Sequence, residues 1–351
     1  MINLSAFGYE KRLKNPSRLF SNTWNDKSFI NGKSVKDFEQ KFQTFCNAQD
    51  CVAVSSCTSA LHLSLLALSV GPGDEVITSP FTWVSTVEVI RQVGAKVVYA
   101  DIKDDFTLDP LDVKNKITSA TKAIILVDLF GLPCDVDAFM KLGPIVIQDA
   151  AQSTGAIYKR KRIGGIAHLT CFSFYPTKNL SCWGDAGAVT GNKEYIDVIK
   201  KLRNHGQEKR FDIKMVGWNA RMDSIHAEVL LNKLPRLDEW NKRRREIAHR
   251  YNEELQGIVD TPQAHSQSIH VYHQYVIMSM HKDKIQSALS NRNIQSRTYY
   301  PIPLHQTTVY KGDGHYPKAE LASLNNLAIP VHQYLTDKEV GLIIKTIKQA
   351  I

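Results

Sequence analysis

The stretch AIILVDLFGLPCDVDAFMKLGPIVIQ, residues 123–148, contains two continuous apolar runs, at 123–127 and 145–148. A helix is predicted between them, at 136–142. Continuous apolar runs are typical of strands that are buried on both faces, and strands that alternate with helices form a mostly parallel sheet. This stretch therefore predicts an α/β fold in which helices cover both faces of the sheet.

The same alternation extends from this stretch toward the N-terminus. The predicted elements are strands at 52–55, 75–78 and 96–100, an almost wholly apolar helix at 58–69, and a helix at 84–92. Beyond Ser173 the chain changes to a glycine-rich loop, a short strand at 186–190 and charged helices. We expect a three-layer α/β/α arrangement for residues 1–235.

The C-terminal third has a different pattern. Residues 234–255 are rich in Arg and Glu and amphipathic, as expected of a helix that bridges two domains. A strand is predicted at 270–278 and a closing helix at 343–351. The sequence therefore predicts two domains, a large one at 1–235 and a smaller α+β domain at 236–351.

The chain has 351 residues, 43% of them hydrophobic, which excludes a disordered protein. Its net charge of +9 is carried by residues 121–351. The densest basic clusters are predicted to be a hairpin tip (Lys159–Arg162) and the solvated face of a helix (Lys242–Arg245). Nucleic-acid binding is less favoured, because neither zinc-finger spacing nor an RNA-binding signature accompanies these clusters.

The six cysteines show neither a Cys-x-x-Cys pair nor metal-ligand spacing with histidines, so we expect thiols in a reducing compartment and no metal site. The first twelve residues contain no apolar stretch typical of a signal peptide. No apolar run approaches the length that spans a bilayer. These features predict a cytosolic protein without a membrane partner.

Ser55-Ser56-Cys57-Thr58-Ser59 places small residues where a predicted strand meets a buried helix. Unpaired N–H groups and the positive end of the helix dipole make such a junction an anion site, suited to a cofactor phosphate. An ordinary helix N-cap would give the same pattern.

Asp149 closes the second apolar run. Ligands of α/β sheets bind at the carboxyl ends of strands, and a carboxylate there can keep a pyridine nitrogen protonated; a capping Asp is the alternative. Lys178 follows in a hydroxyl-rich loop, where a lysine can form an imine with an aldehyde and then act as a general base. Trp83, just after a predicted strand, could stack on a flat ring, although an aromatic residue there is more often part of the core.

These motifs, in this order, resemble those of the DegT/DnrJ/EryC1/StrS sugar aminotransferases, which are fold-type I pyridoxal phosphate (PLP) enzymes. The resemblance extends over almost the whole chain, and its order and spacing are specific. Its fragments are Ile30–Glu39, Gly73–Ile77, the Asp149 and Lys178 motifs, Arg203–Gly206, Val216–Met222, Tyr300–His305 and Leu327–His332.

The resemblance implies roles for individual residues. Lys178 matches the lysine that binds PLP covalently, and Asp149 matches the partner of its ring nitrogen. Gln152 matches a residue near the phenolic oxygen of PLP, and Trp83 matches the aromatic residue that stacks on its ring. The phosphate cradle is matched by Thr58, Ser59 and Ser173. Asn219 matches a residue that reaches the cofactor phosphate of a second subunit, which implies a homodimer with shared sites, and Arg221 and His305 match positions that face the sugar nucleotide.

The implied reaction transfers an amino group from an amino acid, expected to be L-glutamate, to a nucleotide-linked keto-deoxysugar at C-3 or C-4. Two alternatives stay open, an aminocyclitol aminotransferase and a non-catalytic PLP-binding regulator. Two residues depart from the usual pattern: Cys57 and Ala186 stand where relatives commonly have Gly. A His at the lysine position would indicate a dehydratase, and Lys178 argues against that branch.

Overall fold

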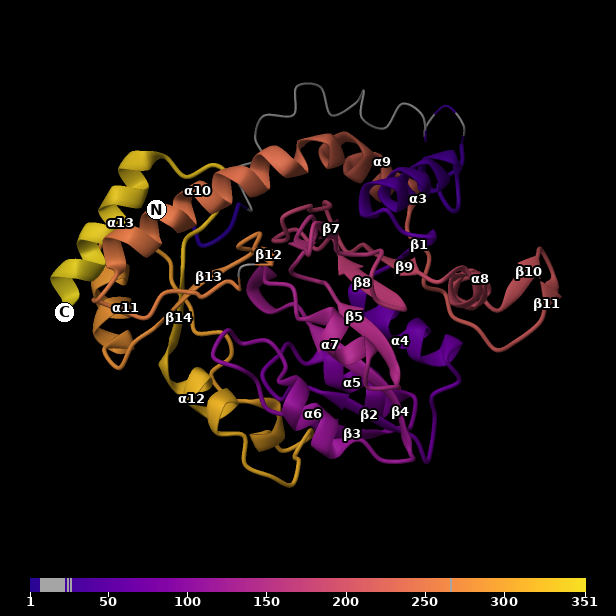
Figure 1. Ribbon diagram of the computed structural model, residues 1–351. Helices are drawn as coiled ribbons and strands as arrows, with labels where there is room; N and C mark the ends of the chain where they lie inside the picture. The colour runs from indigo at the N-terminus through magenta and orange to yellow at the C-terminus, as the bar shows by residue number, and fades with distance from the viewer. Residues whose placement is uncertain (7–22, 24, 26, 266) are drawn as a thin grey trace.

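A computed structural model describes residues 1–6, 23, 25, 27–265 and 267–351. Residues 7–12 of the N-terminal stretch in which a signal peptide was sought lie outside this part. The chain is built around one large sheet with the strand order β1-β9-β8-β5-β4-β2-β3 (Figure 1). Its strands are β1 (Asp50–Val54), β2 (Glu75–Thr78), β3 (Lys96–Tyr99), β4 (Thr121–Val127), β5 (Ile145–Asp149), β8 (Leu169–Ser173) and β9 (Gly187–Gly191).

The strands of this sheet run in one direction except β9, which pairs antiparallel with both β1 and β8. The predicted parallel α/β sheet is therefore confirmed. Strand β8 was not predicted, because Thr170 and Ser173 interrupt its apolar residues, although all five of its residues are buried.

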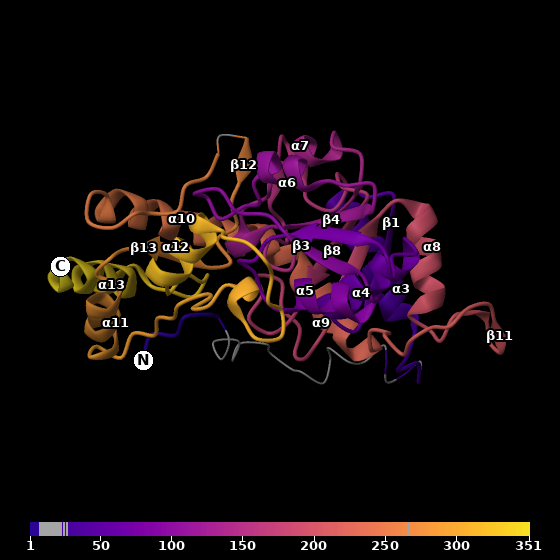
Figure 2. The ribbon, with the colours of Figure 1, turned by 90° about the horizontal axis from the view of Figure 1, so that it is seen from below.

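Helices cover both faces of the sheet. Alternate strand residues point to two separate cores; Ile124 and Leu126 of β4 face one, and Ala123 and Ile125 face the other. Figure 2 shows α6 and α7 on one side of the sheet and α4 and α5 on the other. The helices of this part are α3 (Lys33–Cys46), α4 (Cys57–Ala67), α5 (Ser85–Gln92), α6 (Pro110–Lys116), α7 (Val136–Met140), α8 (Lys193–Leu202) and α9 (Ser224–Lys233).

Helix α10 (Leu237–Leu255) runs from the sheet toward the C-terminal part (Figure 1). Its first residue, Leu237, belongs to a core of the large sheet, whereas Ile247 and Tyr251 belong to a third core. The remaining C-terminal elements are β13 (Tyr275–Met278), α11 (Lys282–Ser290), α12 (Pro317–Asn325), β14 (Asn326–Ile329) and α13 (Asp337–Ala350). Residue 235 as a domain boundary stays a prediction.

Three expectations for this region were partly wrong. The predicted strand at 270–278 begins only at Tyr275, and the closing helix begins at Asp337, where Thr336 and Glu339 form a capping box. The face at Lys242–Arg245 is not wholly solvated. Arg244 is only 1% exposed, and its guanidinium donates to the backbone carbonyls of Tyr272 and Val331.

Small strands complete the fold. Lys159 and Arg160 form the tip of the β6–β7 hairpin with positive φ angles, as the sequence predicted. The β10–β11 hairpin projects from the body of the molecule (Figure 1). Among the described residues, no helix combines the length and apolar character needed to cross a bilayer. The small strands are β6 (Ile157–Tyr158), β7 (Lys161–Arg162), β10 (Gln207–Lys209), β11 (Asp212–Ile213) and β12 (Ser268–Ile269).

Candidate active site

The sheet topology brings three of the predicted motifs to one edge. Strands β1, β5 and β8 are mutually parallel, so their carboxyl ends meet there, and β9 begins there at Gly187. Ser55 follows β1, Asp149 ends β5 and Ser173 ends β8. Motifs that are more than 100 residues apart in the sequence therefore converge at one place in the fold.

The start of α4 forms the hydroxyl-rich part of this edge. Ser56 is the N-cap, and its side chain accepts a hydrogen bond from the backbone N–H of Ser59 at 3.0 Å. The Thr58 hydroxyl donates to Ser85 Oγ at 2.9 Å. The N–H groups of Cys57 and Thr58 lie in the first helical turn, where no intrahelical carbonyl can pair with them. This turn has the donors and the dipole that an anion needs.

Gly187 packs directly against this turn. A Cβ at Gly187 would lie 2.5 Å from the carbonyl carbon of Ser56 and 2.8 Å from the backbone nitrogen of Cys57. Its Cα pairs in register with Ser173, the other predicted phosphate ligand. The absence of a side chain at residue 187 therefore lets β9 approach the start of α4.

Asp149 lies beside α4 and is 6% exposed. Its carboxylate accepts hydrogen bonds from the Thr86 hydroxyl at 2.8 Å and from the backbone N–H of Ala151 at 3.2 Å. Thr86 also contacts the hydroxyl of Thr82 at 3.0 Å. Burial raises the pKa of Asp149, and the positive charge of Lys178 opposes that rise. Thr86 was not predicted as a site residue, because no local pattern links it to Asp149; its position near the start of α5 brings its hydroxyl to the carboxylate.

Lys178 lies in the loop after β8, where its backbone N–H donates to the carbonyl of Tyr175 at 2.8 Å. Burial lowers the pKa of the Lys178 amine, while the negative charge of the Asp149 carboxylate acts to raise it. The lowered pKa increases the fraction of the amine that is neutral and able to accept a proton. His273 is buried nearby, and its pKa is held well below the ordinary value by burial and by the charges of Lys178 and Arg244.

Trp83 and Gln152 meet at Tyr300. The Gln152 side-chain amide donates to the Tyr300 hydroxyl at 3.4 Å, and its oxygen accepts from the backbone N–H of Phe130 at 2.6 Å. The ring centroids of Trp83 and Tyr300 are 6.0 Å apart, and Trp83 is 59% exposed. Its ring is therefore available for stacking on a ligand. Tyr300 belongs to the Tyr300–His305 motif but had no predicted role. Its contact with Gln152 places it in the candidate active site.

Asn219 and Arg221 lie next to β1, where the backbone of Arg221 bridges to Val54. The Arg221 guanidinium donates to the side-chain oxygens of Asn219 at 3.1 Å and Asn204 at 3.0 Å. Asn219 is exposed. The pair thus occupies the β1 end of the same edge, and the predicted roles of both residues stay predictions.

His305 lies apart from the cluster. It is 4% exposed, its ring packs against Tyr99 and Tyr316, and its Nε2 lies 3.1 Å from a carboxylate oxygen of Glu320. Tyr99 belongs to β3, the edge strand three positions from β5. No contact among the described residues joins His305 to Lys178 or Asp149, and its role toward a sugar nucleotide stays a prediction.

Cys57 does not crowd the turn in which it lies. Its side chain is buried in the core beneath α4, and Sγ lies 3.8 Å from a carboxylate oxygen of Asp149. Burial raises the pKa of the thiol well above its ordinary value. The side chain is therefore a neutral thiol beside the carboxylate.

A family model, the DegT/DnrJ/EryC1/StrS aminotransferase family, matches residues 14–348 of this sequence. The chain belongs to this family. Its fold is that of the PLP-dependent aminotransferases of fold type I. The sequence therefore identified both the family and the fold class.

This DegT/DnrJ/EryC1/StrS member is similar to curated proteins and to solved structures, of which two relatives and one structure are described. It is 37% identical to the UDP-2-acetamido-2-deoxy-3-oxo-D-glucuronate aminotransferase of Pseudomonas aeruginosa, covering 90% of each chain. It is 34% identical to the pleiotropic regulatory protein of Geobacillus stearothermophilus, covering 99% of this chain and 97% of the relative. The structure of Streptomyces venezuelae DesV with a ketimine intermediate matches with a TM-score of 0.92 at 33% identity, covering 95% of this chain and 93% of DesV.

The residues of this DegT/DnrJ/EryC1/StrS member fit PLP. The turn of α4, against which Gly187 packs closely, suits a phosphate, and the buried Asp149 suits a protonated ring nitrogen. Lys178 supplies an amine with a lowered pKa for an aldehyde. Among the described residues, no group of three His, Cys, Asp or Glu side chains could hold a metal ion.

Proposed function

We propose that this protein is a PLP-dependent aminotransferase that moves an amino group from L-glutamate to the keto group of a nucleotide-linked sugar. One observation carries the proposal. The Lys178 amine, the Asp149 carboxylate and the helix-start anion site of α4 meet at a single sheet edge. The name of the P. aeruginosa relative supports a nucleotide-sugar acceptor, and its 3-oxo group makes C-3 the position to test first, with C-4 second.

When bound, PLP supplies an aldehyde for the substrate amine and a ring that withdraws electrons from the adjacent carbon. Lys178 Nζ takes the proton from Cα of the donor and later returns one to the carbon that receives the amino group. Asp149 would hold the ring nitrogen protonated, which would stabilise negative charge that develops at Cα. Water would supply the oxygen of 2-oxoglutarate as the amino group of glutamate passes to the bound cofactor, and the sugar carbonyl would lose its oxygen as water when it receives that amino group.

The other predicted residues position these groups. The start of α4, with Thr58, Ser59 and Ser173, would hold the phosphate of PLP. Trp83 would cover one face of the ring, and Gln152 would donate to its phenolic oxygen. Thr86 fixes the orientation of the Asp149 carboxylate through its 2.8 Å hydrogen bond. These contacts orient the ring so that proton transfer is confined to Lys178.

We further propose a homodimer in which Asn219 reaches the neighbouring subunit's cofactor phosphate and Arg221 faces the sugar nucleotide. The projecting β10–β11 hairpin supports it. Phe211 is 82% exposed and Ile213 is 67% exposed, and exposed apolar side chains that gather in one place mark candidate interaction surfaces. His305 is the less supported substrate residue, because its imidazole contacts Glu320.

The state of the cysteines supports a proposal about the cellular compartment of this enzyme. All six, each in the described part of the chain, are buried thiols that form no disulfide. Disulfide-free cysteines are typical of reducing compartments, which supports a cytoplasmic location.

One relative favours a second function. The G. stearothermophilus protein is named as a regulator, so a PLP-binding regulator without turnover is the alternative for this chain. The pairing of Lys178 with Asp149 favours catalysis, because a regulator that only binds PLP has no need of a buried carboxylate and a proton-accepting amine at the same edge.

The test is to incubate the protein with PLP, L-glutamate and a panel of nucleotide-linked keto-sugars and keto-cyclitols, and to identify aminated products by NMR. We expect an amino-sugar product, and its NMR spectrum assigns C-3 or C-4. Lys178→Ala should bind PLP but form no product. An aminated cyclitol alone would establish the aminocyclitol alternative, whereas PLP binding without 2-oxoglutarate from glutamate would establish the regulator.

A further inference from the structure

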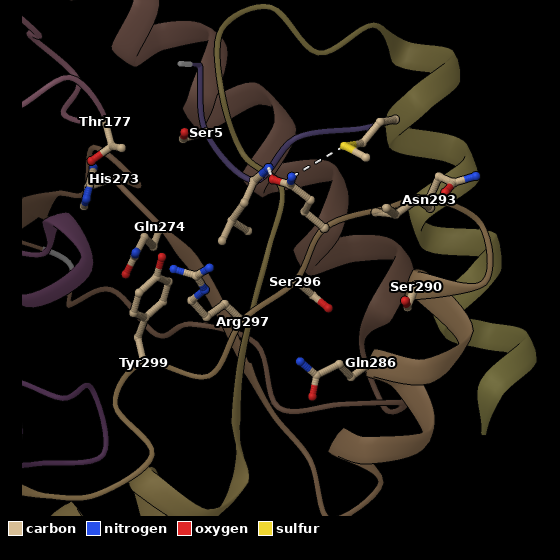
Figure 3. A pocket seen from close by; sticks show the side chains of 14 residues that line it. Ser5, Thr177, His273, Gln274, Gln286, Ser290, Asn293, Ser296, Arg297 and Tyr299 are labelled. Atoms are coloured by element: carbon tan, nitrogen blue, oxygen red, sulfur yellow. Dashed lines mark hydrogen bonds between the residues drawn. The ribbon is translucent and has the colours of Figure 1, made fainter. Parts of the chain in front are cut away.

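A cavity of about 480 Å³ lies between the N-terminal residues, the C-terminal part and the loop that carries Lys178. Figure 3 shows Arg297, Gln274 and Tyr299 gathered on one side of it, with Thr177 and His273 beyond them. Among the described residues that line the cavity, Arg297 has the only charged side chain, no carboxylate is present, and Met1 adds its N-terminal amine. The other polar linings are hydroxyls, amides and the buried imidazole of His273.

This cavity adjoins the reacting amine. Thr177 immediately precedes Lys178, and His273 is close enough for the charge of Lys178 to lower its pKa. Tyr299 immediately precedes Tyr300, whose hydroxyl contacts Gln152. Arg297 and Tyr300 are three residues apart, so their Cα atoms are at most about 10 Å from each other. An anion bound by Arg297 would therefore lie in the same cavity as Thr177, the residue that precedes Lys178.

The positive charges of Arg297 and Arg244 are not neutralised by any described acidic side chain. The Arg297 guanidinium forms no ion pair with any described residue, and it lies 6.0 Å from the centre of the Tyr299 ring. Arg244 is buried behind the cavity wall, and it donates to the carbonyl of His273 at 3.4 Å. Nε and Nη2 of Arg244 lack hydrogen-bond partners among the described residues. A buried, unpaired guanidinium is costly, and a bound anion nearby would offset part of that cost.

We propose that Arg297 binds the side-chain carboxylate of a dicarboxylic amino-acid donor and so makes this enzyme select glutamate over neutral amino acids. The inference rests on the proposed aminotransferase function and adds the residue that determines donor specificity. A guanidinium binds a carboxylate through two parallel N–H bonds, and the amide of Gln274 beside it can donate a third.

Arg297 is the one charged side chain among the described lining residues, and no described lining carboxylate competes for it. A guanidinium that pairs with a single carboxylate through two parallel N–H bonds matches the distal carboxylate of a five-carbon diacid.

The test uses the PLP-loaded enzyme and two unreactive probes, glutarate and butyrate, which differ by one carboxylate. Binding of each probe is measured by isothermal titration calorimetry for the wild type and for Arg297→Gln. Because charge-assisted hydrogen bonds contribute strongly, we expect about a 10- to 100-fold loss of glutarate affinity and less than a twofold change for butyrate. Arg297→Lys keeps the charge but not the paired N–H groups, so its affinity for glutarate should lie between those of the wild type and Arg297→Gln.

Arg292→Gln is the matched control. Its guanidinium bonds to Thr346 at 3.0 Å and Gln349 at 2.7 Å, on α13 and away from the cavity, so both probes should bind as in the wild type. Rates of 2-oxo acid formation are compared for glutamate and alanine in single turnovers. Arg297→Gln should slow the glutamate reaction at least tenfold and leave the alanine reaction nearly unchanged.

The outcomes distinguish failure of the donor-specificity inference from failure of the proposed aminotransferase function. Unchanged glutarate affinity in Arg297→Gln, equal losses for both probes, or a loss confined to the nucleotide sugar would overturn the donor-specificity inference while the wild type still transaminates. If the wild type forms no 2-oxo acid from any amino acid, the proposed function itself is wrong.

Discussion

Replacing Gly187 by Ala should damage the cofactor site, although residue 187 has no side chain and bears no catalytic group. The added Cβ would lie 2.5 Å from the carbonyl carbon of Ser56, 2.6 Å from its oxygen and 2.8 Å from the nitrogen of Cys57. All three are backbone atoms of the turn that starts α4, so no side-chain rotation can remove the overlap.

The size of the effect follows from these distances. Carbon atoms in contact prefer about 3.5–4.0 Å, so β9 or the start of α4 must move by about 1 Å. Overpacking of this kind typically costs about 1–3 kcal/mol of stability. A displacement of about 1 Å in a positioning group can reduce a catalytic rate by about 100-fold. We therefore expect weaker PLP binding and a slower half-reaction, together with a lower Tm.

The assay is a titration of the apoprotein with PLP, followed by absorbance, with thermal unfolding measured in parallel. Gly71→Ala is the control, because a Cβ there would meet only the carbonyl oxygen of Val93, at 3.9 Å. Gly71 lacks a positive φ angle, so the same substitution carries no backbone strain there. If the Gly187→Ala and Gly71→Ala variants bind PLP equally well, the turn does not depend on this close approach and the reasoning fails.

Two further predictions concern buried carboxylates. Asp149→Asn should lower the amino-transfer rate by about 10²–10³-fold, as loss of a preorganised charge does. The Tm of the apoprotein near pH 7 should stay the same or rise. Burial raises the pKa of Asp149, so the ionised carboxylate destabilises the folded apoprotein at that pH. Asp128 is fully buried, and burial raises its pKa from 3.8 to about 6, against hydrogen bonds from Ser153, Cys134 and Gln148. The folded protein therefore keeps this proton at a pH where the unfolded chain has lost it, and the unfolding free energy should fall by up to about 3 kcal/mol as pH rises from about 4 to 6.

Each of these two carboxylate predictions has its own control measurement. Asp197→Asn, at an exposed carboxylate of α8, should leave the transfer rate unchanged, and an equal loss there would show that the effect is not local. For Asp128, denaturant unfolding at several pH values should give a shallower slope in Asp128→Asn than in the wild type. Equal slopes would assign the pH dependence to other groups.

Much of the fold was predictable because its elements are defined by local patterns. The apolar runs at 123–127 and 145–148 became β4 and β5, and their burial on both faces explains why polar alternation is absent. Strand β8 could not be predicted in the same way, since Thr170 and Ser173 acquire partners only within the sheet. Arg244 was misassigned for a related reason. A basic residue on a polar helix is expected in water, and only the tertiary structure brings the carbonyls of Tyr272 and Val331 to its guanidinium and buries it.

The sequence by itself determined the parallel α/β sheet and the family, and it predicted the pair Lys178 and Asp149, because short motifs with fixed order carry that information. Tertiary structure alone decided which residues surround that pair. Thr86 reaches Asp149 from a helix 63 residues earlier, and Tyr300 reaches Gln152 from 148 residues later. Arg297 faces the same cavity as Thr177 although no local pattern links them. Such contacts depend on how strands and helices pack across the sheet edge, and spacing along the chain does not encode them.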